Sequence, residues 1–244
     1  MIRLMKLELK KIKLGPYIIG FCLLNAAIVG IIYSLLSVLD PLDVQVMYPS
    51  YLNYEFVYKT ALTMVKISAT LLMAILLAQL VVGEYKTGTI STLFLYPISR
   101  RNLLLAKLLL VMLLGFVFML VSMSVSVAFF YVVNPFTHFI PEPISVFADR
   151  RLIGETGFQS LLTVAASFIP LSIGMRKRSA TALLIASFVL AIILYLPINA
   201  PNNDIIFSSN PWISLIFAAA GVAAAFETLY KVERKDVLLD VFPY

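Results

Sequence analysis

The chain has 244 residues, 61% of them hydrophobic and 13% charged, and a formal net charge of +6. A soluble domain of this size cannot bury so much apolar surface, so the composition excludes a soluble globular protein and indicates an integral membrane protein. A single histidine excludes a zinc-protease site built on paired histidines, and a single cysteine excludes an internal disulfide.

Long uncharged runs predict the membrane-spanning segments. Six runs reach the roughly 17 to 25 residues that a helix needs to cross a hydrocarbon core of about 30 Å. These runs do not alternate polar and apolar residues, as the strands of a membrane barrel do. We therefore expect an all-α membrane protein in which residues 1–244 form one transmembrane domain, a bundle of six transmembrane helices. The expected spans are residues 17–38, 62–82, 103–133, 157–174, 180–198 and 211–230.

The segment before the first span has its own pattern. Ile2, Met5, Leu9 and Ile12 repeat at helical spacing, and the lysines of this segment lie largely opposite them. This pattern predicts an N-terminal amphipathic helix that lies in the membrane interface. A basic flank that only fixes the topology is the alternative.

Residues 48–58 and 134–155 are two of the loops expected on the outer side of the membrane. The first carries tyrosines three or four residues apart, which is typical of an anchoring belt at the membrane–water boundary. A substrate-contact surface is the alternative. Lys66 follows near the outer end of the second span, where we expect its ammonium group to reach the lipid headgroups.

Basic residues predict the orientation of the bundle. Fifteen of the 19 Lys and Arg residues lie within residues 3–13, 86–107, 176–178 and 231–235. Because cytoplasmic loops carry an excess of Lys and Arg, we expect both the N- and the C-terminus in the cytoplasm. The net charge is thereby explained without a nucleic-acid partner.

Four polar residues inside the expected spans are candidates for a buried role: Asn25, Gln79, Ser122 and Ser126. We interpret each as an interhelical hydrogen-bond partner, with a place on a transport pathway as the alternative. The spans carry no Asp or Glu at their centres, and the chain has no G-x-S-x-G motif, so we predict no catalytic residue and no metal ligand.

The sixth span contains AAAGVAAA, residues 218–225. Small residues four apart let helices approach closely, so we expect this stretch to pack within the subunit. A contact between two subunits is the alternative.

The most polar long stretch is GEYKTGTISTLFLYPISRR, residues 83–101. Gly83 and Gly88 have the spacing of a phosphate-binding loop, but Thr89 and Ile90 follow where that loop needs Lys and Ser or Thr. We therefore predict no nucleotide site in this chain.

The same stretch fits a short cytoplasmic helix better than a phosphate-binding loop. Thr89 and Ser91 are alternative candidates for the N-cap. The apolar face is formed by Ile90, Leu93 and Phe94, and Pro97 ends the helix. This apolar face is not needed by any core, so it predicts a docking surface for a partner protein.

The stretch resembles the cytoplasmic loop of ABC-2-type transporter permeases, as found in small bacterial members with six spans. The matching residues are Glu84, Lys86, Gly88, Thr89, Leu93, Pro97, Ser99, Arg100 and Lys107. The direct match covers about 25 residues, and the six-span plan with its N-terminal amphipathic helix extends it along the chain. The loop between the last two spans is shorter than in some members of that family, so nothing about an outer gate is carried over.

The resemblance implies a coupling helix between spans two and three that docks on a separate ABC ATP-binding subunit. Its docking residues would be Glu84, Gly88, Thr89, Ile90, Leu93, Phe94, Pro97, Arg100 and Arg101. The apolar residues would anchor the helix in a groove of the ATPase, while Glu84, Arg100 and Arg101 hold it against the bundle.

The resemblance also implies a permease subunit in a bacterial plasma membrane, surrounded by lipid and paired with a second permease subunit in a homo- or heterodimer. The partner ATPase would bind ATP and Mg²⁺, so this chain holds no cofactor and is not itself an enzyme. The exported substrate would be amphipathic or hydrophobic, such as an antimicrobial peptide, an antibiotic or a lipid-like molecule. The alternatives are an ATPase-independent carrier or channel, an intramembrane enzyme, and a membrane scaffold or sensor.

Overall fold

The computed structural model describes most of the apolar chain. The described residues are 4–5, 9, 14–38, 54–83, 100–137, 150–177, 179–195, 198–199, 205–206 and 211–234. The helices are α2 (Leu14–Val38), α4 (Tyr54–Leu77), η2 (Ala78–Val82, a π-helix), α7 (Arg100–Thr137), α8 (Arg150–Ala166), α9 (Ile169–Lys177), α10 (Ala180–Tyr195) and α11 (Pro211–Arg234). Two short strands, β1 (Ile198–Asn199) and β2 (Ile205–Ile206), pair antiparallel.

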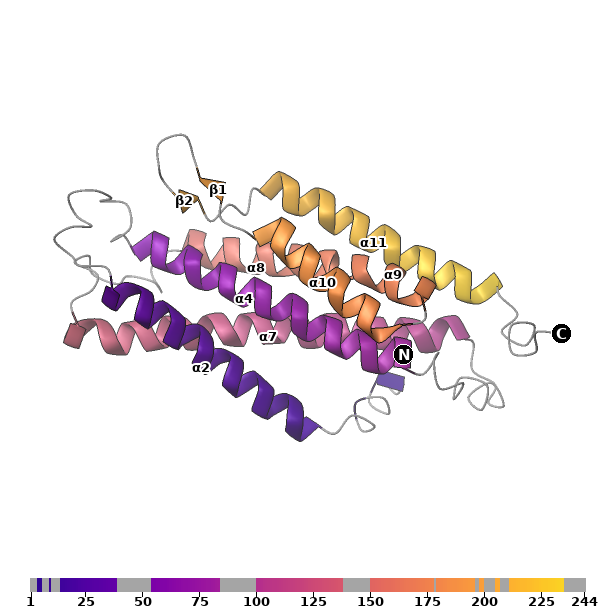
Figure 1. Cartoon of the computed structure of the whole chain (residues 1–244), viewed down its shortest axis with the longest axis horizontal. Helices are drawn as coiled ribbons and strands as arrows, with labels where there is room; N and C mark the ends of the chain where they lie inside the picture. Colours follow the sequence, from indigo (N-terminus) through magenta and orange to yellow (C-terminus); the bar gives the residue numbers. More distant parts are fainter. Residues whose placement is uncertain are drawn as a thin grey trace.

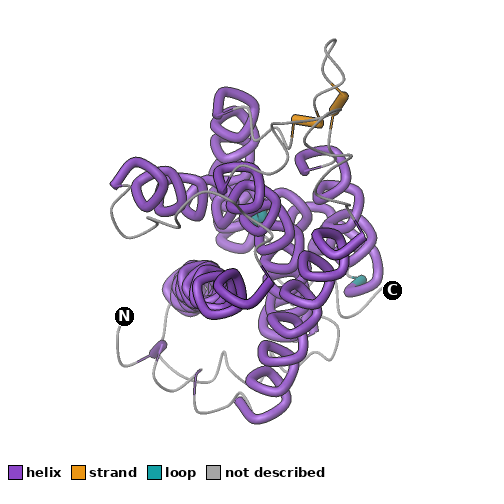
Figure 2. The backbone as a smooth tube through the Cα atoms, turned by 90° about the vertical axis from the view of Figure 1, so that its left-hand side faces the viewer, coloured by secondary structure: helices purple, strands orange, loops and turns teal. Residues whose placement is uncertain are grey.

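The long helices lie side by side as an elongated bundle, seen from the side in Figure 1 and from one end in Figure 2. The first turns of α2, α7 and α10 and the last turns of α4, α9 and α11 all point to the right in Figure 1. Helix α4 has the most buried apolar stretch and packs against α2, α7, α8 and α10. It is therefore the central helix of the described bundle.

The expected all-α membrane fold is confirmed. Among the described residues, five helical stretches are long and apolar enough to cross a membrane: residues 15–34, 57–82, 102–135, 151–177 and 212–230. The fifth expected span, residues 180–198, corresponds to α10, which is apolar but has only 16 residues. At 1.5 Å per residue it measures about 24 Å, shorter than a typical hydrocarbon core.

The fourth expected span is broken in two. Helix α8 ends at Ala166, residues 167–168 form a turn, and α9 begins at Ile169. Pro170 explains the break, because a proline has no backbone N–H and its ring clashes with the carbonyl four residues earlier, here that of Ala166.

Gly221 sets the packing of α11 on α8. A Cβ atom at Gly221 would lie 2.0 Å from the carbonyl oxygen of Ala165, so only glycine permits this close approach. The small-residue stretch 218–225 thus packs within the subunit at its central glycine, as expected.

Several expectations fall outside the described residues. The N-terminal amphipathic helix is one, since only residues 4–5 and 9 of that segment are described. The expected coupling helix lies within residues 84–99, which are also outside them, as are most of the two outer loops. Tyr58, which we expected in an anchoring belt, is instead buried inside the bundle on α4.

Candidate functional site

The end of α4 nearest residues 84–99 is a π-helix, η2. A π-helix bonds each N–H to the carbonyl five residues earlier, and such turns occur frequently at functional sites. Here the backbone N–H of Gly83 donates to the carbonyl of Ala78. The Nζ atom of Lys107, on α7, donates to the carbonyl oxygen of Leu80 at 3.0 Å.

A second contact reaches η2 from α2. The hydroxyl of Tyr17 donates to Oε1 of Gln79. Tyr17, Gln79, Leu80 and Lys107, which we call the inner hub, therefore join α2, η2 and α7 through polar contacts. Lys107 is buried, with 2% of its surface exposed.

Residues of the inner hub flank the expected docking segment in the sequence, with Gln79 and Leu80 before it and Lys107 after it. Residues 84–99 connect Gly83, directly after η2, to Arg100, the first residue of α7. Lys107 lies two turns into α7 and binds back to η2. A displacement of this segment would thus reach both α4 and α7 through short, polar-bonded connections.

The expected docking residues themselves lie mostly beyond the described residues. These are Glu84, Gly88, Thr89, Ile90, Leu93, Phe94 and Pro97. Arg100 and Arg101 form the first turn of α7, with side chains that the structure does not describe.

The expected polar residues of the spans lie on η2, α2 and α7. Gln79 belongs to the inner hub, whereas Asn25 is buried on α2 and Ser122 and Ser126 are buried on α7. The rings of Phe21 and Phe118, one turn before Asn25 and Ser122, meet edge to face at 5.0 Å between centroids. Helices α2 and α7 run in the same direction (Figure 1), and Asn25 and Ser122 each follow one of these rings by four residues, on the same face of its helix.

The hydrogen bonds of these polar residues on α2 and α7 stay within one helix. Asn25 Nδ2 donates to the carbonyl of Phe21, and Ser126 Oγ to that of Ser122. Asn25 Oδ1 and Ser122 Oγ have no hydrogen-bond partner among the described residues.

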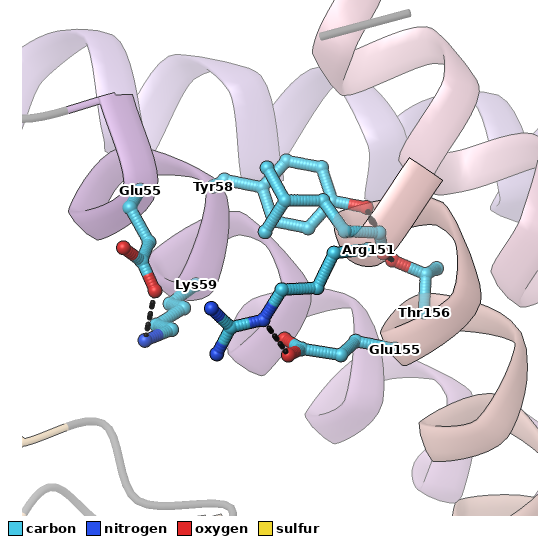
Figure 3. Close-up of polar contacts among 7 residues, drawn as sticks. Glu55, Tyr58, Lys59, Arg151, Glu155 and Thr156 are labelled. Atoms are coloured by element: carbon cyan, nitrogen blue, oxygen red, sulfur yellow. Dashed lines mark hydrogen bonds and ion pairs between the residues drawn. The ribbon is translucent and has the colours of Figure 1, made fainter. Parts of the chain in front are cut away.

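At the opposite end of the bundle, α4 is fastened to α8 (Figure 3). The Tyr58 hydroxyl donates to the carbonyl oxygen of Leu152 at 3.2 Å and hydrogen-bonds the hydroxyl of Thr156. These contacts fix the start of α8 against α4.

Two ion pairs flank Tyr58 in Figure 3. Glu55 pairs with Lys59 at 2.6 Å, and Arg151 pairs with Glu155 at 3.0 Å. The hydrogen bond and the charge of Lys59 lower the pKa of Glu55 below its ordinary value, so this carboxylate stays ionised at neutral pH. Exposed pairs of this kind add little to stability.

Lys66 corrects an expectation from the sequence. It was expected at the lipid headgroups, but its side chain is buried, with 1% of its surface exposed. Its Nζ atom donates to Oε1 of Gln159 on α8 at 3.1 Å and lies 5.8 Å from the ring centroid of Tyr195 on α10. Lys66 faces other helices because α4 is central, so no lipid borders it.

The periodicity of polar residues in the sequence could have identified the partners of Lys66, although mean hydropathy could not. Thr156, Gln159 and Thr163 recur at positions i, i+3 and i+7, which places them on one face of a helix. The structure buries that face against α4 and α10, where the Tyr195 hydroxyl donates to Thr163 Oγ1 at 3.3 Å. Among the described residues, no three His, Cys, Asp or Glu side chains come together as metal ligands.

Comparison with known proteins agrees with this arrangement. Residues 4–194 match the model of a family described as "ABC-2 family transporter protein". The chain is also 32% identical over 234 residues to an uncharacterized protein, YcbO, of Bacillus subtilis (strain 168), covering 96% of this chain and 99% of that protein. No solved structure matches. The chain is a multi-pass membrane protein that belongs to the ABC-2 family of transporter proteins.

Proposed function

We propose that this permease subunit forms the translocation path of an ATP-driven exporter and is moved by a separate ATPase subunit docked on residues 84–101. The ATPase binds ATP and Mg²⁺, and a second permease subunit, identical or related, completes the path. The substrate is amphipathic or hydrophobic, such as a peptide, an antibiotic or a lipid-like molecule. The protein lies in a bacterial plasma membrane with both termini in the cytoplasm.

The inner hub carries this proposal. The docking segment follows η2 in the chain and precedes the first turns of α7. Lys107 binds η2 to α7, and Tyr17 binds η2 to α2. A rigid-body pull on the segment is therefore transmitted to three helices at once. Interfaces of this kind convert small displacements at one site into helix shifts elsewhere.

The direction of the helices supports the cytoplasmic placement of this segment. Helices α4, α9 and α11 end, and α2, α7 and α10 begin, towards the same side of the bundle (Figure 1). The chain's basic clusters lie next to these helix ends, at residues 3–13, 86–107, 176–178 and 231–235. The positive-inside rule assigns that side to the cytoplasm.

The decisive experiment is a pull-down with Leu93→Asp. The chain is expressed with its native neighbours, solubilised in mild detergent and purified by a tag. We expect the wild-type chain to bring down a protein with a Walker loop. Leu93→Asp places a charge on the apolar docking face and should abolish this, while the chain itself still elutes as a monodisperse membrane protein.

Ser91→Asp is the matched control. It adds the same charge two residues away, beside the apolar face, and aspartate keeps N-cap chemistry. This variant should retain the ATPase. If wild type and Leu93→Asp retain equal amounts of ATPase, the docking role of this face is wrong. If no ATPase accompanies the wild-type chain in several mild detergents, the ATP-driven reading gives way to a carrier or a scaffold.

A further inference from the structure

Lys66 is an ionisable residue inside a membrane span. It lies nine residues beyond Val57 in the apolar stretch 57–82, or about 14 Å along the helix axis. Charged residues at such depth are rare because the hydrocarbon disfavours them, and they mark functional sites by default. Lys66 therefore needs a partner or a function.

The described acidic side chains are all engaged elsewhere. Glu55 pairs with Lys59, Glu155 with Arg151, and Glu227 with Arg176 at 2.7 Å. Within the described part of the chain, Lys66 thus has no anionic partner. Its one hydrogen bond goes to the neutral amide of Gln159, whereas an ammonium group carries three N–H donors.

The surroundings of Lys66 form a polar seam between α4, α8 and α10. Thr156, Gln159, Ser160 and Thr163 are buried on α8, and Ser167 is buried in the turn that follows it. Most of their hydroxyls are satisfied within their own helix: Thr156 bonds the carbonyl of Leu152, Ser160 that of Thr156, and Ser167 that of Thr163.

This pattern of bonds determines which contacts break when the seam opens. When α8 moves away from α4, the hydroxyls keep their intrahelical bonds, and few polar groups are left unsatisfied. The bonds that would break are those from Lys66 to Gln159, from Tyr195 to Thr163, and from Tyr58 to α8. An incoming anionic group can accept hydrogen bonds from the donors that are released.

We propose that Lys66, together with Gln159 and Tyr195, binds the anionic group of an amphipathic molecule, a carboxylate or phosphate carrying an apolar tail, when the seam between α4 and α8 opens. The ammonium supplies the charge, and the amide and the phenol supply neutral hydrogen-bonding groups. Helix α10, which carries Tyr195, also offers apolar surface for the tail, because its Phe188, Val189 and Ile192 are exposed. The proposal rests on the proposed function in taking this molecule for the exported substrate.

A fluorescent fatty acid tests this site directly. The purified full chain in nanodiscs of zwitterionic lipid is titrated with 11-(dansylamino)undecanoic acid and, separately, with its methyl ester. Since a hydrogen bond to a charged group contributes about 1.5–3 kcal/mol, we expect the acid to bind at least about tenfold more tightly than the ester. Lys66→Gln should bring the acid to the affinity of the ester, and Lys66→Arg should keep the preference.

Gln159→Glu is the second variant, and it keeps the proposal testable if Lys66→Gln fails to fold. It places a carboxylate beside Lys66 with almost no change of shape, so the chain supplies its own anion. We expect this variant to fold at least as well as wild type and to lose the preference for the acid. Lys59→Gln, which removes an exposed lysine of α4, is the matched control and should behave as wild type.

The outcomes separate this proposal from the proposed function. Equal affinity for acid and ester in wild type, or an unchanged preference in both Lys66→Gln and Gln159→Glu, would overturn the anion site. Displacement of the probe by lysophosphatidic acid supports an amphipathic ligand, whereas displacement by inorganic phosphate at the same concentration contradicts it. The ATPase pull-down is unaffected by Lys66→Gln if docking and substrate binding are separate sites, so either proposal can fail without the other.

Discussion

The buried polar side chains of this bundle divide by length. Short hydroxyls, such as those of Ser126, Ser160 and Ser187, bond the carbonyl four residues earlier in their own helix. Long side chains reach other helices, as Lys66 and Lys107 do. Serine and threonine commonly satisfy themselves in this way, and among the described residues the donors of the buried interhelical hydrogen bonds are lysines and tyrosines.

Lys107 is the residue on which the inner hub depends. Lys107→Met keeps the length and burial of the side chain but leaves the carbonyl of Leu80 without this donor. An unsatisfied buried carbonyl costs about 1–3 kcal/mol, so we expect the free energy of unfolding to fall by that amount. Unfolding of the solubilised chain in a denaturing detergent series measures it.

Lys177→Met is the control for Lys107. Lys177 is exposed at the end of α9, and its loss should change stability by no more than about 0.5 kcal/mol. Equal effects of the two variants would mean that the bond to Leu80 does not stabilise η2.

The sequence predicted some of these residues and missed others for a definite reason. Gln79 was identified because it is polar within an apolar run, and it does contact another helix. Lys66 was misplaced because distance from a span's end does not reveal which helix is central. That depends on which faces pack together, and hydropathy contains no such information.

At the scale of elements, length and composition predicted most of the helices. The exceptions have local causes. Pro170 divides the fourth expected span into α8 and α9, and α10 stops at Tyr195, two residues before Pro197, in agreement with the restriction that proline places on the residue before it. The π-helix η2 could not be predicted, because AQLVV is compatible with an ordinary α-helix.

Gly221 fixes the distance between two of these elements. We expect Gly221→Ala to lower the free energy of unfolding by about 1–3 kcal/mol, because its Cβ would meet the backbone of Ala165 and α11 must shift. The same unfolding series in detergent measures this change.

Gly30→Ala on α2 provides the same substitution in open surroundings, since nothing lies within 4 Å of a Cβ there. It should be neutral or should stabilise by about 0.5–1 kcal/mol, as alanine favours a helix interior more than glycine. Should both substitutions prove neutral, the close approach of α11 to α8 would be refuted.

At the scale of the whole molecule, polar contacts hold the bundle together at both ends by different means. One end has Tyr58 with the Glu55–Lys59 and Arg151–Glu155 pairs, and the other has the inner hub and the pair of Arg176 with Glu227. The long apolar faces between them, such as those of α2 and α10, are exposed and suited to lipid. This division gives the molecule two ends that differ in charge and in their connection to residues 84–99.

The orientation of these two ends is testable with single cysteines. In a Cys22→Ser background, Lys59→Cys and Lys177→Cys place one thiol at each end of the bundle. Both lysines are exposed, and Lys59 forms only an exposed i,i+4 pair, so neither change should cost more than about 0.5 kcal/mol. Since basic clusters predict the cytoplasmic side, a membrane-impermeant maleimide should label Lys59→Cys in intact cells and Lys177→Cys only after permeabilisation. The reverse pattern would place residues 84–101 outside the cell, where no ATP-driven subunit could dock. It would contradict the proposed mechanism of coupling but not the structure of the bundle.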